Sequence, residues 1–123
     1  MKDYLIISSS VELLRVALED IMFISSDGNY SSIVLTNGES RMVTLQLGQL
    51  EKMISERVKR DNVRFIRAGK SLIINCDYIF LINLSKQQIV LSDGRLSTHT
   101  LSASKDALKR IKEAIENEIL RRI

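Results

Sequence analysis

The sequence predicts a mainly β protein, with about ten short, mostly antiparallel strands in small sheets, one inserted helix and a long C-terminal helix. Short clusters of β-branched and aliphatic residues alternate with the turn dipeptides Asp27-Gly28, Asn37-Gly38 and Asp93-Gly94. Such dipeptides tolerate the positive φ angles of tight hairpin turns. Helical periodicity is confined to two segments, and proline is absent, which argues against extended linkers.

Strands are expected to follow one another with short connections. Each of the three glycine-containing turns predicts a hairpin, and Glu19-Asp20 is expected in a short turn between the second and third strands. The predicted strands lie near Tyr4 to Ser8, Val11 to Val16, Ile21 to Ser25, Tyr30 to Leu35, Ser40 to Thr44, Phe65 to Arg67, Ser71 to Cys76, Tyr78 to Asn83, Gln88 to Ser92 and Leu96 to Leu101.

The inserted helix is predicted from apolar residues that recur at spacings of three or four. Thr44 is available to cap its start. The apolar positions of this helix are Leu47, Leu50, Ile54 and Val58, with Met53 beside them.

The C-terminal helix is expected to begin after Ser102 or Ser104, both suitable N-cap residues, with Asp106 in its first turn. Its apolar stripe either packs on the protein's own sheet or, in the turns beyond Lys112, pairs with a second copy. The stripe consists of Leu108, Ile111, Ile115, Ile119 and Ile123.

Length and composition indicate one globular domain over residues 1–123. The chain is 45% hydrophobic, and no stretch approaches the roughly 18 consecutive apolar residues that a membrane span requires. The apolar run near the start is too short for a signal peptide. The expected location is therefore the cytoplasm.

Basic residues concentrate around the middle of the chain. The net charge is +3, and the segment from Glu51 to Lys70 contains seven basic and three acidic residues, so the rest sums to −1. Such a concentration beside a turn is typical of a surface that binds a polyanion. A solvated helix face with salt bridges would give the same pattern.

Enzymatic chemistry finds little support, and no catalytic, cofactor-binding or metal-ligating residue is predicted. His99, the single histidine, lies in a strand-like alternation, and the single cysteine, Cys76, has no metal-ligand neighbours. Gly69-Lys70-Ser71 ends like a nucleotide-binding loop, but Arg64 stands where the first glycine is required. The residues after Lys70 also read as a strand, not as the helix such a loop opens.

Three loops carry side chains suited to a phosphate backbone. Lysine and arginine neutralise phosphates, while Asn, Ser, Thr and Tyr add short hydrogen bonds. Alternatively, the polar side chains satisfy hydrogen bonds of their own turns. The loops comprise residues 27–32, residues 67–71 and residues 100–105.

The order of these pieces resembles the LytTR DNA-binding domain, the output module of many bacterial response regulators in two-component systems. The most specific match is Phe-x-Arg-x-x-Lys-Ser-x-x-x-Asn, from Phe65 to Asn75. The resemblance covers about residues 10–112, leaving 113–123 as an extension of the C-terminal helix. Further matching stretches are residues 18–25, Gly28-Asn29-Tyr30, Leu47 to Ile54, Tyr78-Ile79, Val90 to Gly94 and Leu101-Ser102.

The resemblance implies a transcription regulator that sends loops into successive major grooves of double-stranded DNA, as two protomers on direct repeats in a promoter. No small-molecule substrate is implied. Arg67 would face the DNA, or would instead be a buried structural partner for a carboxylate. The DNA-binding residues expected from the family pattern are Asn29, Tyr30, Ser31, Arg67, Lys70, Ser71, Ser102 and Lys105.

Two departures from the family pattern affect these expectations. Gly69 stands where many members have histidine, and Ala103 stands where a contacting arginine is frequent, although Lys105 could replace part of that contact. Only about ten residues precede the match, so we expect no receiver domain within this sequence. The chain is then an excised domain, or a stand-alone regulator controlled by a partner protein. The alternative is a dimerisation or protein-interaction module acting through the C-terminal helix, with DNA binding weak or lost.

Overall fold

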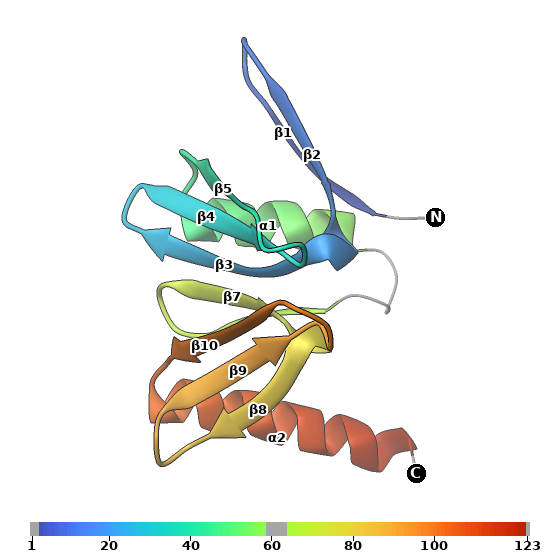
Figure 1. Ribbon diagram of the computed structural model, residues 1–123, viewed down its shortest axis with the longest axis vertical. Helices are drawn as coiled ribbons and strands as arrows, with labels where there is room; N and C mark the ends of the chain where they lie inside the picture. The colour runs from blue at the N-terminus through green and yellow to red at the C-terminus, as the bar shows by residue number, and fades with distance from the viewer. Residues whose placement is uncertain (1–2, 59–63, 123) are drawn as a thin grey trace. The chain divides into compact units, whose positions relative to one another are not determined.

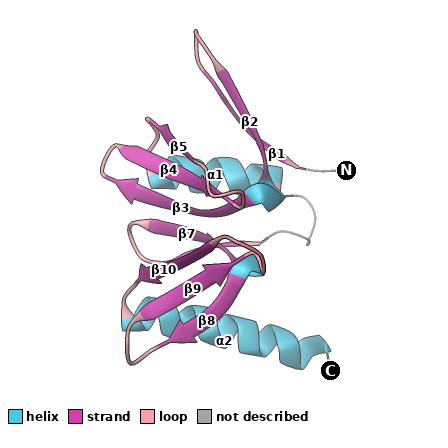
Figure 2. Ribbon diagram, in the orientation of Figure 1, coloured by secondary structure: helices cyan, strands magenta, loops and turns pink. Residues whose placement is uncertain are grey.

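The computed structural model describes residues 3–58 and 64–122 and confirms the mainly β class (Figure 2). The chain forms two compact units, residues 1–77 and residues 78–123, which we describe separately. Ten strands, two α-helices and two short 3-10 helices make up the described part of the chain.

A five-stranded antiparallel sheet forms the centre of the first unit (Figure 1). Its strands run in the order β5-β4-β3-β7-β6, so β7 pairs with β3 although β4, β5, α1 and β6 come between them in the sequence. A separate hairpin, β1-β2, completes the strands of this unit. Their bounds are β1 Tyr4–Ser8, β2 Leu13–Ala17, β3 Ile21–Asp27, β4 Tyr30–Leu35, β5 Ser40–Val43, β6 Phe65–Arg67 and β7 Leu72–Asn75.

Helix α1 (Leu47–Arg57) contributes buried residues to the core of this unit. Leu50 and Ile54 are buried together with Ile24, Ile33 and Ile73 of the sheet. Alternate residues of a strand face opposite sides, so these three isoleucines mark the side of the sheet that meets the helix. The core therefore fixes α1 against β3, β4 and β7.

Asn75 is the one buried side chain within the described residues of β7 that carries polar atoms. Its Nδ2 donates to the Ile21 carbonyl oxygen over 2.9 Å, and its Oδ1 accepts from the Asp77 amide over 3.0 Å. Both ends of the amide are thus satisfied without water, as a buried polar group requires. The last residue of the Phe65 to Asn75 motif therefore has a structural role.

The second unit contains a three-stranded antiparallel sheet, in the order β10-β9-β8, and the helix α2 (Lys105–Arg122). Helix α2 contacts β8, and Leu108 and Ile111 on it are buried. These positions confirm the first part of the predicted apolar stripe, whereas the side chains of Ile119 and Ile123 lie outside the described residues. The strands are β8 Ile79–Asn83, β9 Gln88–Ser92 and β10 Thr98–Ser102.

Most expected elements agree with the structure to within two residues, and the three predicted hairpins are confirmed. Gly28, Gly38 and Gly94 have φ angles of 69°, 90° and 77°. Two details were wrong. Residues Leu18–Asp20 form a 3-10 helix instead of a simple turn, and α1 is capped at Gln46 instead of Thr44.

Candidate nucleic-acid interface

Two loops that are distant in the sequence lie at the same end of the five-stranded sheet. The antiparallel pairing of β3 with β7 places Ser25 opposite Leu72, and the Ser26 amide donates to the Ser71 carbonyl oxygen over 2.9 Å. The β3-β4 hairpin tip and the β6-β7 turn therefore end side by side. We call them together the loop end: residues 27–30 and 68–71.

The β3-β4 tip presents hydrogen-bonding side chains to solvent. Asn29 is exposed, and Tyr30 is 50% exposed. The Ser26 hydroxyl donates to the carbonyl oxygens of Gly28 and Tyr30, each over 3.3 Å, which holds the tip closed. The tip therefore offers an amide and a phenol on a fixed backbone.

Ser31, predicted as a DNA contact, lies inside the protein instead. It is 1% exposed, and its hydroxyl donates to the Leu45 carbonyl oxygen over 2.7 Å. A side chain with no surface cannot reach a phosphate, so Ser31 connects β4 to the segment before α1. Ser31 therefore has a structural role, as in the alternative that the polar side chains of these loops hydrogen-bond within the protein.

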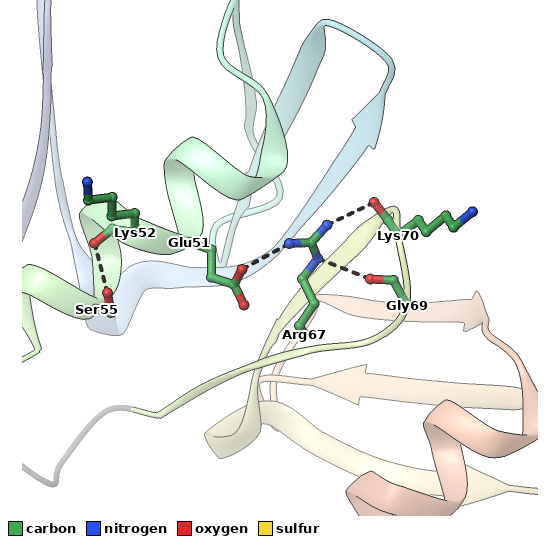
Figure 3. Close-up of polar contacts among 6 residues, drawn as sticks. All are labelled: Glu51, Lys52, Ser55, Arg67, Gly69 and Lys70. Atoms are coloured by element: carbon green, nitrogen blue, oxygen red, sulfur yellow. Dashed lines mark hydrogen bonds and ion pairs between the residues drawn. The ribbon is translucent and has the colours of Figure 1, made fainter.

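The β6-β7 turn presents a lysine. Gly69 has a φ of 77°, which L-residues with a side chain rarely adopt, and this angle reverses the chain within two residues. Lys70 and Ser71 are both exposed at the turn. The side chain of Lys70 is directed away from Arg67 and the turn in Figure 3. The opening glycine of the turn thus places a cation at the loop end.

Arg67 occupies the base of the same turn, and its guanidinium lies between the turn and Glu51 of α1 (Figure 3). Its Nε donates to the Gly69 carbonyl oxygen over 3.0 Å, and its Nη2 donates to the Lys70 carbonyl oxygen over 3.3 Å. Its Nη1 forms a 2.9 Å ion pair with Glu51 of α1 (Figure 3). The carboxylate partner expected in one of the two readings of Arg67 is therefore present, but the arginine is 33% exposed and not buried.

The N-terminus of α1 also reaches the loop end. Gln46 donates from Nε2 to Oδ1 of Asn29 over 3.4 Å, and its backbone amide donates to the Gln49 side chain over 2.9 Å. Sequence reasoning missed both Gln46 and Glu51. Each meets a residue 16 or 17 positions away on another element, and no local pattern signals such a pair.

The basic residues of segment 51–70 that the structure describes do not gather at one place. Arg64 lies beside Cys76, at the end of β7 away from Lys70, because the Cys76 amide donates to the Arg64 carbonyl oxygen. Arg57 ends α1, where a cation favours the helix dipole. Lys59 and Arg60 lie outside the described residues. Among the described residues of this segment, Lys70 is the cation that the β6-β7 turn presents.

The remaining predicted contacts lie in the second unit. Ser102 is exposed at the end of β10, and Lys105 is the exposed first residue of α2. The Ser104 hydroxyl between them accepts from the Ala107 amide over 3.2 Å and caps the helix. The segment is thus an ordered strand-to-helix connection with exposed polar residues.

The described residues contain no group of three or more metal-ligating side chains, and no helix within them is long and apolar enough to cross a membrane. A hollow of about 580 Å³ in the first unit is lined by residues of β1, β2 and β5, such as Leu13 and Met42, and does not include the loop end. Another, of about 180 Å³, is lined in part by Asp27 and Tyr30 of the loop end. The candidate site is the exposed surface of these hydrogen-bonding loops, which defines the class as a β-rich binding module.

Comparison with known proteins specifies this class. The model of the LytTr DNA-binding domain matches residues 12–116, and the chain therefore belongs to the LytTR family of DNA-binding domains. This is a family of DNA-binding modules and not of enzymes. A search of curated proteins gives no match.

A solved structure confirms the fold. The chain is similar to the LytTr DNA-binding domain of a protein described as a methyl-accepting/DNA response regulator from Bacillus cereus. The TM-score is 0.64 at 14% sequence identity, and the match covers 94% of this chain and 98% of the other. At this identity the similarity concerns the fold, and residue roles have to come from this chain's own geometry.

Proposed function

We propose that this chain is a bacterial transcription-regulator module that binds double-stranded DNA sequence-specifically through loops inserted in the major groove. The observation that carries the proposal is the pairing of β3 with β7, which brings Asn29, Tyr30 and Lys70 to one end of a sheet. Membership of a family of DNA-binding domains supplies the ligand class.

The exposed side chains of the loop end match the chemistry of DNA. The ammonium group of Lys70 either attracts a phosphate or donates hydrogen bonds to O6 and N7 of guanine. An asparagine amide such as that of Asn29 has the donor and acceptor needed to pair with adenine. Tyr30 and Ser71 supply hydroxyl groups for phosphate oxygens.

The size of the loop end also suits a groove. The β3-β4 hairpin and the β6-β7 hairpin occupy four adjacent strand positions. Three strand spacings amount to about 14 Å, comparable with the roughly 12 Å width of the major groove. One hairpin tip, or the edges of both, can therefore approach the bases without a recognition helix.

In this proposal the two units act as one DNA-binding domain in the bacterial cytoplasm. Ser102 and Lys105 are proposed to contact the phosphate backbone from the second unit, since both are exposed on an ordered connection. Two protomers are proposed to occupy two direct repeats, with a partner protein supplying the regulatory signal.

Selection from a random pool of duplexes at two salt concentrations tests the function. We expect enrichment of two similar short motifs about one helical turn apart, while a single-stranded pool shows no enrichment. Log affinity should fall linearly with log salt, with a slope of about −0.9 for each phosphate neutralised. Failure to enrich any duplex would contradict the proposal and favour a protein-interaction module.

A further inference from the structure

We infer that Arg67 is a positioning residue for DNA binding: it ties the β6-β7 turn to α1 through Glu51 and so fixes the direction of Lys70. The inference rests on the proposed function, because Lys70 has to contact DNA for its direction to matter. It differs from the expectation that the Arg67 guanidinium itself faces the DNA.

The guanidinium of Arg67 connects two elements through its three nitrogens. On one side, Nε and Nη2 donate to the consecutive carbonyl oxygens of Gly69 and Lys70. On the other side, Nη1 pairs with the Glu51 carboxylate over 2.9 Å. Figure 3 shows the guanidinium between Glu51 and the turn, with the Lys70 side chain directed away from it. The backbone of Lys70 is thus held while its ammonium group stays outside.

A planar fork is necessary for this arrangement. Arginine presents its N–H groups in fixed directions, whereas a lysine ammonium is a single point charge that cannot span two carbonyl oxygens and a carboxylate. Replacing Arg67 by Lys therefore keeps the positive charge but removes the directed hydrogen bonds to the turn and to Glu51. The variant thus distinguishes an effect on the position of the turn from an effect of charge on phosphates.

Glu51 is held on a rigid element. It belongs to α1, which is anchored by the buried Leu47, Leu50 and Ile54. The turn itself contains Gly69, which has wide conformational freedom. The ion pair therefore ties the glycine-containing turn to the fixed position of the helix.

The exposure of the ion pair indicates a local effect instead of a global one. The side chains of Arg67 and Glu51 are 33% and 48% exposed. Ion pairs with such exposure contribute little to the stability of a whole domain. Loss of the pair should therefore loosen the turn without unfolding the sheet.

Replacing Glu51 tests the inference, because positioning and charge predict opposite changes in DNA affinity. Its carboxylate is a negative charge beside a cationic turn, so charge alone predicts that Glu51→Gln strengthens DNA binding. Positioning predicts the opposite, because a neutral amide holds the guanidinium less firmly. Glu56→Gln, an exposed position on the same helix, makes the same change in charge away from Arg67 and serves as the matched control.

The experiment measures affinity for the selected duplex over a series of salt concentrations. We expect Arg67→Lys to bind roughly tenfold more weakly, and Glu51→Gln roughly threefold more weakly, with unchanged salt slopes. Glu56→Gln should bind as tightly as the wild type or slightly more tightly. The double variant of Arg67 and Glu51 should be no weaker than Arg67→Lys alone, because both residues act through one contact.

A second measurement needs no DNA. Backbone NMR order parameters at Gly69 and Lys70 should fall in both variants of the ion pair and stay unchanged in Glu56→Gln. Unchanged order parameters in both variants would overturn the inference. So would wild-type affinity for Arg67→Lys, tighter binding by Glu51→Gln, or a salt slope reduced by about 0.9 in Arg67→Lys, which would make Arg67 itself a phosphate contact.

The inference and the proposed function fail in different ways. If Lys70→Ala leaves affinity unchanged, the assignment of this turn to DNA is wrong, whatever the order parameters show. If Lys70→Ala weakens binding but Arg67→Lys does not, the proposed function stands and the inference alone is overturned.

Discussion

Replacing Ile73 by Ala is expected to destabilise the protein by about 2–5 kcal/mol, the range for truncating a buried isoleucine. Ile73 is 1% exposed in β7 and belongs to the core that includes Leu50 and Ile54 of α1. Truncation leaves a cavity between the helix and the sheet, because both surfaces are fixed by their other contacts. Urea unfolding measures the loss.

Met42→Ala provides the control on the same sheet. Met42 lies on the edge strand β5 and is 71% exposed, so its truncation should change the unfolding free energy by no more than about 0.5 kcal/mol. Similar losses at the two positions would contradict the placement of the core between α1 and the sheet.

Replacing Lys70 by Ala is expected to weaken binding to the selected duplex by about 1–3 kcal/mol if the ammonium group reaches a base edge. If it reaches a phosphate instead, the loss should be similar for all sequences and the salt slope should fall by about 0.9. Stability should not change, because Lys70 is exposed at a turn. Fluorescence anisotropy titrations at several salt concentrations distinguish the two contacts.

Lys52→Ala is the matched control for charge. Lys52 is exposed on α1, and its side chain points away from Lys70 in Figure 3. Both variants remove one positive charge from the first unit. Equal losses of affinity would show that binding depends on net charge and not on the loop end.

The fold was predictable from local patterns because its turns carry their own signals. Asp27-Gly28, Asn37-Gly38 and Asp93-Gly94 each require positive φ, and each closes the hairpin that the sequence predicted. The cap of α1 was misplaced because Gln46 is not one of the residue types favoured at the N-cap, and its pairing with Gln49 is seen only in the structure.

The candidate site was less predictable because it is made by contacts between distant segments. Exposure of Asn29 and Lys70 follows from their turns, but the burial of Ser31 depends on Leu45, and the orientation of Arg67 depends on Glu51. Adjacent serines, Ser31 and Ser32, lie on opposite faces of β4. The alternation of the strand therefore does not tell which of the two is buried. Apart from Ser31, the predicted DNA contacts stay predictions.

Chemical-shift mapping of the backbone amides during titration with the selected duplex tests the central claim most directly. We expect the largest changes within the first unit at residues 27–30 and 68–71. The opposite end of the same sheet, at residues 36–38 and 75–77, should change little. Changes confined to that opposite end, or spread evenly over the sheet, would contradict DNA binding by the loop end.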